Sequence, residues 1–367
     1  MFFNHAEYWG GGESNLFEIC NSLKQSQIQI WIAGPRNSKL QIRCTQNSIN
    51  YYEILFPSFK VKKFELLANL YLFIRNIRAF QKRVQADIII SNSARCNLYA
   101  TIFYFFYPKC IQIWILNEYQ ISKLHLYIFG WIPKYYIAVS NNIKEYYNRK
   151  NTIVIRNAFS LPRQFLEITS IINRINDPYV IGFFGRFVRL KGIHILIDSV
   201  QLLKDRIPLL SLKLFGSPSE REPKYFNELK VQILKNKLED VVTFVGFRND
   251  VLAAMKECSV IVSPTLSKHG GPESFGRTII EAMIVGVPVI ATNCGGPKEI
   301  IEPNISGILV NEDDPVALAD AIEKIYSRKD LAQMYVKNAS ACLSNYENSV
   351  IAKEYIKVFD SLETKVE

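Results

Sequence analysis

The sequence has 367 residues, of which 49% are hydrophobic and 21% charged, so it has enough apolar material for two cores and is not disordered throughout. This length favours two domains over one. The net charge of +10 is uneven: residues 1–160 carry 19 Lys and Arg against 8 Asp and Glu, with 30 of the 46 aromatic residues, whereas the remainder carries 25 against 26. A basic, aromatic half indicates an anionic partner for that half, and a solvated basic face is the simpler alternative.

Cysteine spacing and hydropathy narrow the class of protein further. The seven cysteines form no CxxC pair, which argues against a structural zinc site or a disulfide framework and for reduced thiols. The longest apolar run, residues 101–116, is interrupted by Pro108 and Lys109 and falls short of the roughly 18 residues of a spanning helix. The first residues lack the basic and apolar regions of a signal peptide. We therefore expect a cytoplasmic location.

The first half of the chain predicts strands separated by helices. After a first strand that ends at His5, a helix is expected over 13–24 and a long one over 64–84, with strands over 28–33, 51–56, 87–91, 111–116, 135–140 and 152–156. Only Met1–Asn4 precede His5, so the first strand is shorter than the usual five or six residues. A short central strand leaves ladder groups on its neighbours unpaired. We therefore expect a true start a few codons upstream, or a less stable N-terminal domain.

The second half alternates more clearly. Strands are predicted over 179–185, 210–216, 241–246, 259–264, 287–292 and 307–310, and helices over 192–206, 223–237, 315–326 and 349–363. Continuous apolar strands alternating with amphipathic helices are typical of a parallel sheet covered on both faces.

A polar stretch without a strand separates the two halves. Residues 161–178 end in Asn-Asp-Pro, which breaks regular structure. We expect domains over 1–165 and 166–345, and a C-terminal helix within 346–367 that packs back toward the first domain. The fold class is α/β, with two Rossmann-like doubly wound domains facing a cleft, because ligands of such sheets bind at the carboxyl ends of the strands.

The segment 270–300 is the most informative. It follows a predicted strand and enters a helix expected to begin near Ser274, and a helix N-terminus suits a diphosphate. Glu273 stands at the mouth of this helix and Glu281 about two turns further along. A carboxylate can accept hydrogen bonds from vicinal hydroxyls such as those of sugars and riboses. Either residue alone is more simply read as a cap or a solvated surface group, but both together in a glycine-flanked loop favour a ligand site.

A second segment, GFFGRFVRLKG, spans residues 182–192. Arg186 and Lys191 follow a predicted strand, and two cations at this sheet edge can hold a diphosphate and stabilise its charge as it leaves. The alternative is two ordinary surface cations, which is the interpretation we keep for Arg189.

These motifs resemble the family 4 retaining glycosyltransferases, which have the GT-B fold. The chain matches their E-x7-E motif within GPESFGRTIIEAM and their R-x4-K pair within GRFVRLKG. It is also similar to them in VTFVGF (242–247), ATNCGGPKEII (291–301), GILV (307–310), DPVALADAI (314–322) and, at the N-terminus, WGGGESNLFEICNSL. The resemblance covers nearly the whole chain and is strongest over residues 180–325.

The resemblance implies a role for each matching residue. Arg186 and Lys191, in the loop that Gly185 opens, would bind the donor diphosphate, and with Glu273, which would bond donor-sugar hydroxyls, they form the expected catalytic set. Glu281 would bond the ribose. Other donor-site positions are implied for the backbone of Ser274, Phe275 and Gly276, for the base-binding region Gly246 and Phe247, and for the cleft-closing loop with Gly11 and Gly12. Such enzymes generally need no metal or other cofactor, and no DxD-type carboxylate pair stands beside a plausible metal pocket here.

The histidines depart from the family pattern. Many relatives carry a histidine after the strand matching residues 111–116, where Asn117 and Glu118 stand here, so no catalytic histidine is carried over. His269 precedes the glycine pair and could contact the donor, and His5 ends the first strand, but a lone loop histidine is more often incidental.

The expected reaction moves a sugar with retention from a nucleotide diphosphate sugar to a hydroxyl of a glycan or lipid-linked acceptor, in cell-envelope or exopolysaccharide synthesis (EC 2.4 class). No carboxylate nucleophile for a double displacement is found, which favours front-face displacement. Alternatives are a nucleotide-sugar epimerase of the same fold, a non-catalytic sugar-binding subunit and, last, a nucleic-acid binder, for which no motif is present. The N-terminal domain would hold the acceptor.

A basic stripe within the predicted helix 64–84 suggests a membrane partner. Arg75, Arg78 and Lys82 recur at helical spacing after Lys60, Lys62 and Lys63, and a separate apolar stripe is predicted from Phe64, Leu67, Tyr71 and Ile74. The simpler interpretation is a helix packed on its sheet with a solvated basic face. The sharper hypothesis is peripheral attachment to the inner face of the cell membrane.

Overall fold

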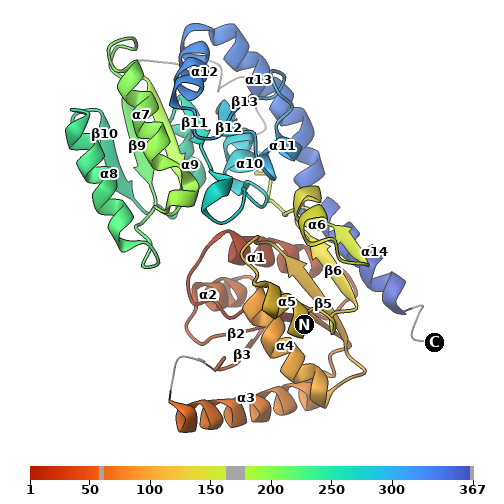
Figure 1. The fold of residues 1–367 in the computed structure, drawn as a ribbon. Helices are drawn as coiled ribbons and strands as arrows, with labels where there is room; N and C mark the ends of the chain where they lie inside the picture. Colours follow the sequence, from red (N-terminus) through yellow and green to blue (C-terminus); the bar gives the residue numbers. More distant parts are fainter. Residues whose placement is uncertain (58–61, 163–177, 364–367) are drawn as a thin grey trace. The chain divides into compact units, whose positions relative to one another are not determined.

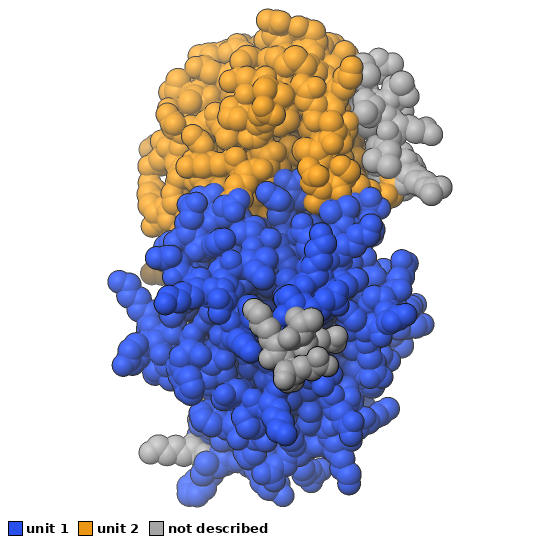
Figure 2. All heavy atoms as spheres, turned by 90° about the vertical axis from the view of Figure 1, so that its right-hand side faces the viewer, with its two compact units in different colours: residues 1–160, 346–367 blue, residues 161–345 orange. Residues whose placement is uncertain are grey.

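A computed structural model describes residues 1–57, 62–162 and 178–363 (Figure 1). The chain divides into two compact units, unit 1 with Met1–Ser160 and Tyr346–Glu367, and unit 2 with Leu161–Asn345 (Figure 2). The domain boundary predicted at residues 165 and 166 lies outside the described residues. No described helix is long and apolar enough to cross a membrane.

Unit 1 is a doubly wound parallel sheet. Its seven strands are ordered β3-β2-β1-β4-β5-β6-β7, and their bounds are β1 Phe2–Phe3, β2 Trp31–Gly34, β3 Asn50–Glu53, β4 Ile88–Ser91, β5 Ile111–Leu116, β6 Tyr135–Ala138 and β7 Thr152–Val154. The strand order reverses between β1 and β4, which is the point where ligands of such sheets bind. Its helices are α1 (Gly11–Leu23), α2 (Lys39–Gln46), α3 (Lys63–Val84), α4 (Ala94–Phe106), α5 (Lys123–Phe129), α6 (Asn141–Tyr147) and α14 (Asn348–Glu363).

Serine side chains begin four of the helices in unit 1. At α2, α4, α5 and α6 the serine that precedes the helix accepts a hydrogen bond from a backbone N–H of the first turn, and these serines are Ser38, Ser93, Ser122 and Ser140. Such caps satisfy donors that a helix otherwise leaves unpaired. These four helices were not predicted, and their serine caps are the signal that could have located them.

Helix α3 corrects one prediction. The side chains buried on the sheet are Phe73, Ile77 and Phe80, whereas Phe64, which is 88% exposed, Leu67 and Tyr71 face solvent. The ring of Phe73 lies 5.3 Å from that of Tyr99 on α4, so α3 packs along α4. The predicted apolar stripe is therefore not the packing face. The helix has two apolar stripes, and it is the C-terminal stripe that packs on the sheet.

Unit 2 repeats the doubly wound plan. Its six parallel strands are ordered β10-β9-β8-β11-β12-β13, with bounds β8 Val180–Phe184, β9 Ser211–Phe215, β10 Val242–Gly246, β11 Val260–Ser263, β12 Val289–Thr292 and β13 Ile308–Val310. Its helices are α7 (Ile193–Leu203), α8 (Pro223–Lys235), α9 (Val251–Lys256), α10 (Arg277–Ile284), α11 (Pro297–Ile300), α12 (Pro315–Ser327) and α13 (Lys329–Cys342). The order reverses between β8 and β11. The predicted fold class, α/β with two Rossmann-like sheets, is confirmed.

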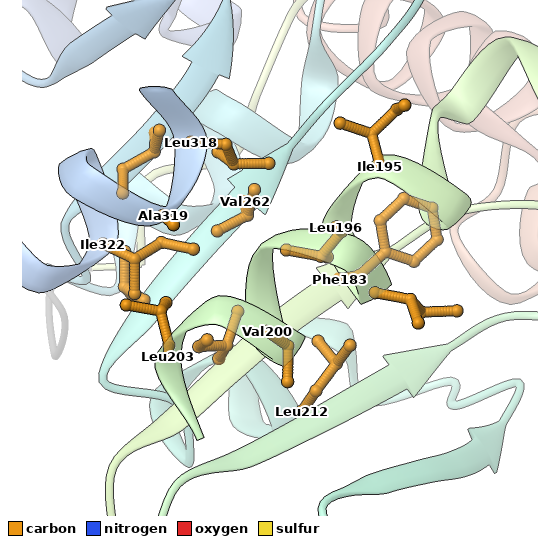
Figure 3. Packing of buried hydrophobic residues seen from close by; sticks show 14 of the residues in the cluster. Phe183, Ile195, Leu196, Val200, Leu203, Leu212, Val262, Leu318, Ala319 and Ile322 are labelled. Atoms are coloured by element: carbon orange, nitrogen blue, oxygen red, sulfur yellow. The ribbon is translucent and has the colours of Figure 1, made fainter. Parts of the chain in front are cut away.

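The core of unit 2 forms where α7 and α12 cover its sheet. Leu196, Val200 and Leu203 on α7 face Leu318 and Ile322 on α12, and all five side chains are buried (Figure 3). This packing fixes the start of α7, and so the loop that joins it to β8.

All seven cysteines are free thiols, six of them buried and Cys342 half-buried. Burial raises the pKa of Cys96 to about 12 and that of Cys258 to about 12, because the thiolate loses its solvation.

We predict that Leu196→Ala lowers the free energy of unfolding by about 2–5 kcal/mol, because a fully buried leucine leaves a cavity when it is truncated. The matched control is Leu202→Ala on the same helix, whose side chain is 38% exposed and whose truncation costs about 1 kcal/mol or less. Urea denaturation of both variants measures the difference. Equal losses would contradict this assignment of the core.

Candidate functional site

The candidate site of unit 2 lies at its strand-order reversal. The loop after β8 leads to the 3-10 turn η3 (Arg189–Lys191), and the loop after β11 leads through the 3-10 turn η4 (Ser267–His269) to Glu273. Because β8 and β11 are hydrogen-bonded neighbours in the sheet, both loops leave the same edge side by side. Residues 82 positions apart in the sequence are thereby brought together.

Lys191 and Glu273 form an ion pair at the meeting point of these loops. The Lys191 ammonium donates to Glu273 Oε2, and the side chains are 22% and 17% exposed. Thr265 Oγ1 donates to the same carboxylate oxygen over 3.4 Å. The pair is therefore shielded but open to a ligand, with a cation and an acceptor of hydroxyl hydrogen bonds next to each other.

Backbone contacts hold the two loops in place. Leu266 N donates to Leu190 O over 2.8 Å. Gly192 has φ +64°, and a Cβ there would lie 1.8 Å from Pro264 O, so only glycine permits this approach. On the next strand, Thr292 Oγ1 donates to Thr265 O over 2.7 Å. Three successive loops are thus tied together below the ion pair.

A pair of glycines after β12 supports the Glu273 segment. Gly296 N donates to Glu273 O over 2.7 Å. A Cβ on Gly295 would lie 2.2 Å from Glu273 O, and one on Gly296 would lie 2.2 Å from Phe275 O. These glycines were noted in the sequence only as part of a matching motif, and their supporting role was missed. The signal was a Gly-Gly pair at the carboxyl end of a strand.

Helix α10 begins at Arg277, so the prediction of a start near Ser274 is wrong. Gly276 precedes the helix with φ +103°, a left-handed conformation that cannot form part of a right-handed helix. Glu273, Ser274 and Phe275 therefore lie in the loop before the helix, with Phe275 buried.

Glu281 lies in the second turn of α10. Its Oε1 is 3.6 Å from Arg277 Nε, and its side chain is 20% exposed. Burial raises the pKa of Glu281, and the charge of Arg277 opposes that rise. Glu281 is therefore a shielded carboxylate next to the loop, and not the solvated surface group of the simpler interpretation.

The remaining predicted positions of unit 2 lie in the loops that follow its strands, and two of them contact the end of β9. Gly185 N donates to Phe215 O over 3.0 Å, and Gly216 N donates to Gly246 O over 2.9 Å, so both loops are anchored to the end of this strand. Arg186 is exposed and has no ion pair with a described residue. Phe247 is 52% exposed after β10. His269 lies in η4 and is half-buried.

Unit 1 gathers carboxamides at its own strand-order reversal. Gly11 and Gly12 open α1, and a Cβ on Gly12 would lie 3.8 Å from Asn117 Nδ2 and 3.9 Å from Asn92 Nδ2. Asn92 Nδ2 donates to Asn4 Oδ1 over 3.3 Å, and Asn117 Nδ2 donates to Asn92 O over 2.9 Å. Asn4 and Asn92 were not predicted. Their signal was an asparagine at the carboxyl end of each of two strands.

His5 lies beside this cluster. Its Nδ1 is 3.2 Å from Ser93 Oγ and 3.3 Å from Cys96 Sγ. Burial, together with the positive charge of Arg95, lowers the pKa of His5 to about 4. Asn117 and Glu118 follow β5, and Glu118 Oε1 accepts from Ala94 N over 3.4 Å at the start of α4.

In the part of the chain that the structure describes, no three His, Cys, Asp or Glu side chains cluster in a way that could hold a metal ion.

Comparison with known proteins finds a family match in the C-terminal part. Residues 165–341 match the family described as glycosyl transferases group 1. The resemblance predicted from the motifs is thereby confirmed for these residues.

Curated relatives match over about half of this chain. A D-inositol 3-phosphate glycosyltransferase of Corynebacterium urealyticum is 31% identical over 51% of this chain and 44% of its own length. A phosphatidyl-myo-inositol mannosyltransferase of Mycobacterium leprae is 28% identical over 50% and 46%, and the capsular polysaccharide biosynthesis glycosyltransferase CapM of Staphylococcus aureus is 30% identical over 50% and 46%. The matched segment spans less than half of the length of these relatives.

The fold likeness extends over the whole chain. The structure of Anabaena HepE in complex with UDP-glucose superposes with a TM-score of 0.82 at 23% identity, covering 98% of each chain. This likeness confirms the GT-B fold.

We predict that His5→Gln makes unit 1 less sensitive to acid. The lowered pKa means that the folded state favours the neutral imidazole, so this contribution to stability is full above about pH 6.5 and is lost as the pH falls toward about 4. Hydrogen exchange of unit 1 peptides at pH 7 and pH 4.5 measures the change. His269→Gln, in unit 2, is the control, and equal acid sensitivity of wild type and His5→Gln would contradict the prediction.

Proposed function

We propose that the protein is a retaining glycosyltransferase that moves a sugar from a nucleotide diphosphate sugar to a hydroxyl of a glycan or lipid-linked acceptor. The observation that carries this proposal is the pairing of Lys191 with Glu273 at the strand-order reversal of unit 2. A cation suited to a diphosphate stands there beside a carboxylate suited to sugar hydroxyls, which is the combination that a nucleotide sugar presents.

Each residue of the site takes a part in this proposal. Lys191 and the exposed Arg186 bind the diphosphate, and Glu273 exchanges its bond to Lys191 for bonds to donor-sugar hydroxyls. Glu281 bonds the ribose, and Phe247 lies against the base. The backbone of Ser274, Phe275 and Gly276 approaches the phosphates and sugar.

The transfer proceeds by front-face displacement. The bond between the anomeric carbon and the diphosphate breaks while a bond to the acceptor oxygen forms on the same face, and the acceptor proton passes to an oxygen of the departing diphosphate. The protein stabilises the charge on the leaving group through Lys191 and Arg186, and positions the reactants. Uridine is the first candidate base, because Anabaena HepE has been crystallised with UDP and with UDP-glucose.

We predict that Lys191→Ala lowers turnover on the order of 10²–10³-fold, because a charge-assisted bond to the leaving group is lost, and that Glu273→Gln also cripples transfer. Thermal melting with and without UDP, together with turnover, separates binding from chemistry. Arg206→Ala, which breaks only an exposed ion pair with Glu323, is the control. Wild-type turnover in both site variants would refute the proposed site.

An epimerase of similar fold is distinguished by its product. Incubation with the donor alone, followed by chromatography, shows a new nucleotide sugar for an epimerase and none for a transferase. A silent sugar-binding subunit is disfavoured because Arg186, Lys191, Glu273 and Glu281 are all present.

We further propose that unit 1 rests on an anionic membrane surface where the acceptor is met. Arg75, Arg78 and Lys82 on α3 are exposed, as is Lys62 before it, whereas Lys60 lies outside the described residues. Residues 62–134 carry ten Lys and Arg against three Asp and Glu. The name of the Mycobacterium leprae relative, phosphatidyl-myo-inositol mannosyltransferase, supports a lipid-linked acceptor here.

We predict that the chain sediments with anionic liposomes at low salt and is released as salt rises, because each basic residue near such a surface contributes about 1 kcal/mol that ions screen. Arg75→Glu with Lys82→Glu should weaken this binding. The control reverses two exposed charges of unit 2, Lys235→Glu with Lys237→Glu. Equal recovery with neutral and anionic vesicles would contradict an electrostatic attachment.

A further inference from the structure

Helix α5 has its apolar side on the outside. Leu124, Tyr127, Ile128 and, just after the helix, Trp131 are all exposed, with Tyr127 at 83% and Trp131 at 65%. No residue within α5 is fully buried. The spacing of these side chains is that of the stripe a surface helix usually turns toward its core. The side chain that turns inward is a histidine, His125, whose ring lies 5.6 Å from that of Trp114 on β5.

The neighbouring helix α4 extends this apolar surface. It packs against α5, and near its end Phe105 and Phe106 are exposed. Ile102 and Leu98, which lie one and two turns before Phe105 on the same side of α4, are half-buried. We call the exposed side of α4 and α5, with Phe105, Phe106, Leu124, Tyr127, Ile128 and Trp131, the apolar face.

Cations are frequent in the segment that carries the apolar face. Arg95, Lys109, Lys123 and Lys134 are exposed, and between residues 94 and 134 they are opposed by a single acidic residue, Glu118. Arg78 of α3 lies over the ring of Phe106, 4.8 Å from its centroid, so the basic stripe of α3 borders the face there. The face therefore combines large apolar side chains with positive charge at one border and an excess of cations in its own segment.

We propose that the apolar face inserts into the interfacial region of an anionic lipid bilayer. Tyrosine and tryptophan have an apolar body and a polar tip and favour the depth of the lipid headgroups. Lysines and arginines at the border meet anionic headgroups. A second copy of the chain is disfavoured as the occupant, because two such faces would bring like charges together.

This inference rests on the proposed membrane attachment and deepens it, because it adds an apolar contact to an electrostatic one. Attraction through the basic stripe of α3 is screened by salt, whereas burial of Leu124 and Tyr127 in lipid is not. Part of the vesicle binding is therefore expected to survive at high salt and to depend on α5.

The first experiment is sedimentation with vesicles of phosphatidylcholine and phosphatidylglycerol in 0.5 M salt. Leu124→Ser with Tyr127→Ser should lower the bound fraction at least tenfold relative to wild type. The control, Leu209→Ser with Val231→Ser, removes two exposed apolar side chains of unit 2 and should leave binding unchanged. Unchanged vesicle binding of the α5 variant would overturn the proposal. So would light scattering without vesicles that shows a dimer for wild type and a monomer for the α5 variant, because the apolar face would then be covered by a second copy of the chain.

The second experiment measures directly whether Trp131 contacts the lipid. Lipids brominated near the headgroup quench tryptophan that touches them, and Trp131 is the exposed tryptophan, whereas Trp114 is buried and Trp9 and Trp31 are half-buried. Quenching should be strong in wild type and largely lost in Trp131→Phe, which keeps an aromatic side chain and so still sediments. Quenching that is absent in wild type, or unchanged in Trp131→Phe, would overturn the proposal.

Nucleotide binding separates this inference from the proposed enzyme activity. None of the α5 residues belongs to the donor site, so UDP should raise the melting temperature of the α5 variants as it does that of wild type. If the apolar face inserts into vesicles but UDP does not raise the melting temperature, the membrane inference stands and the proposed donor site is refuted. If UDP raises the melting temperature but the apolar face does not insert, the donor site stands and the membrane inference is refuted.

Discussion

The site of unit 2 depends on the backbone hydrogen bond between Leu266 N and Leu190 O, together with the close approach of Gly192 to Pro264 O. The ion pair between Lys191 and Glu273 is not the only contact between the two loops, because these uncharged backbone contacts join them as well. The neutral backbone contacts set the geometry, and the charged side chains remain free to exchange partners. The proposed exchange of Glu273 from Lys191 to sugar hydroxyls benefits from that division, since the backbone contacts do not depend on the ion pair.

The excess of aromatic residues in the first 160 residues is used both in the interior and on the surface of unit 1. Part of its aromatic excess is structural: Phe3, Phe56, Phe73, Tyr99 and Phe103 pack ring to ring beneath α3 and α4. Another part lies outside, on the same helices and on α5, beside an excess of cations. Composition alone could not separate these two uses, because a buried and an exposed phenylalanine look the same in a count.

The sequence predicted the strands of unit 2 to within about two residues, because buried parallel strands are continuous apolar runs bounded by turns. It predicted the residues that meet at the reversal, Lys191 and Glu273, through their motifs. The sequence-based predictions were wrong for the packing face of α3 and for the start of α10, where the local pattern is compatible with more than one structure. Helix α3 has two apolar stripes, and α10 is shortened by a glycine whose left-handed conformation no pattern reveals. The supporting contacts of Gly295, Gly296 and the asparagines of unit 1 depend on neighbours distant in sequence, and so could not be read from local pattern.

The buried thiols have a practical consequence. Since six of the seven cysteines are enclosed and burial holds the pKa of those such as Cys96 and Cys258 far above neutrality, little reactive thiolate is available under native conditions. The half-buried Cys342, whose pKa burial also raises, is the one position to replace. A cysteine introduced at an exposed position of each unit would then take a maleimide probe selectively, without a cysteine-free background. Distances between such probes, measured by electron spin resonance or fluorescence transfer, would show whether UDP changes the separation of the two units.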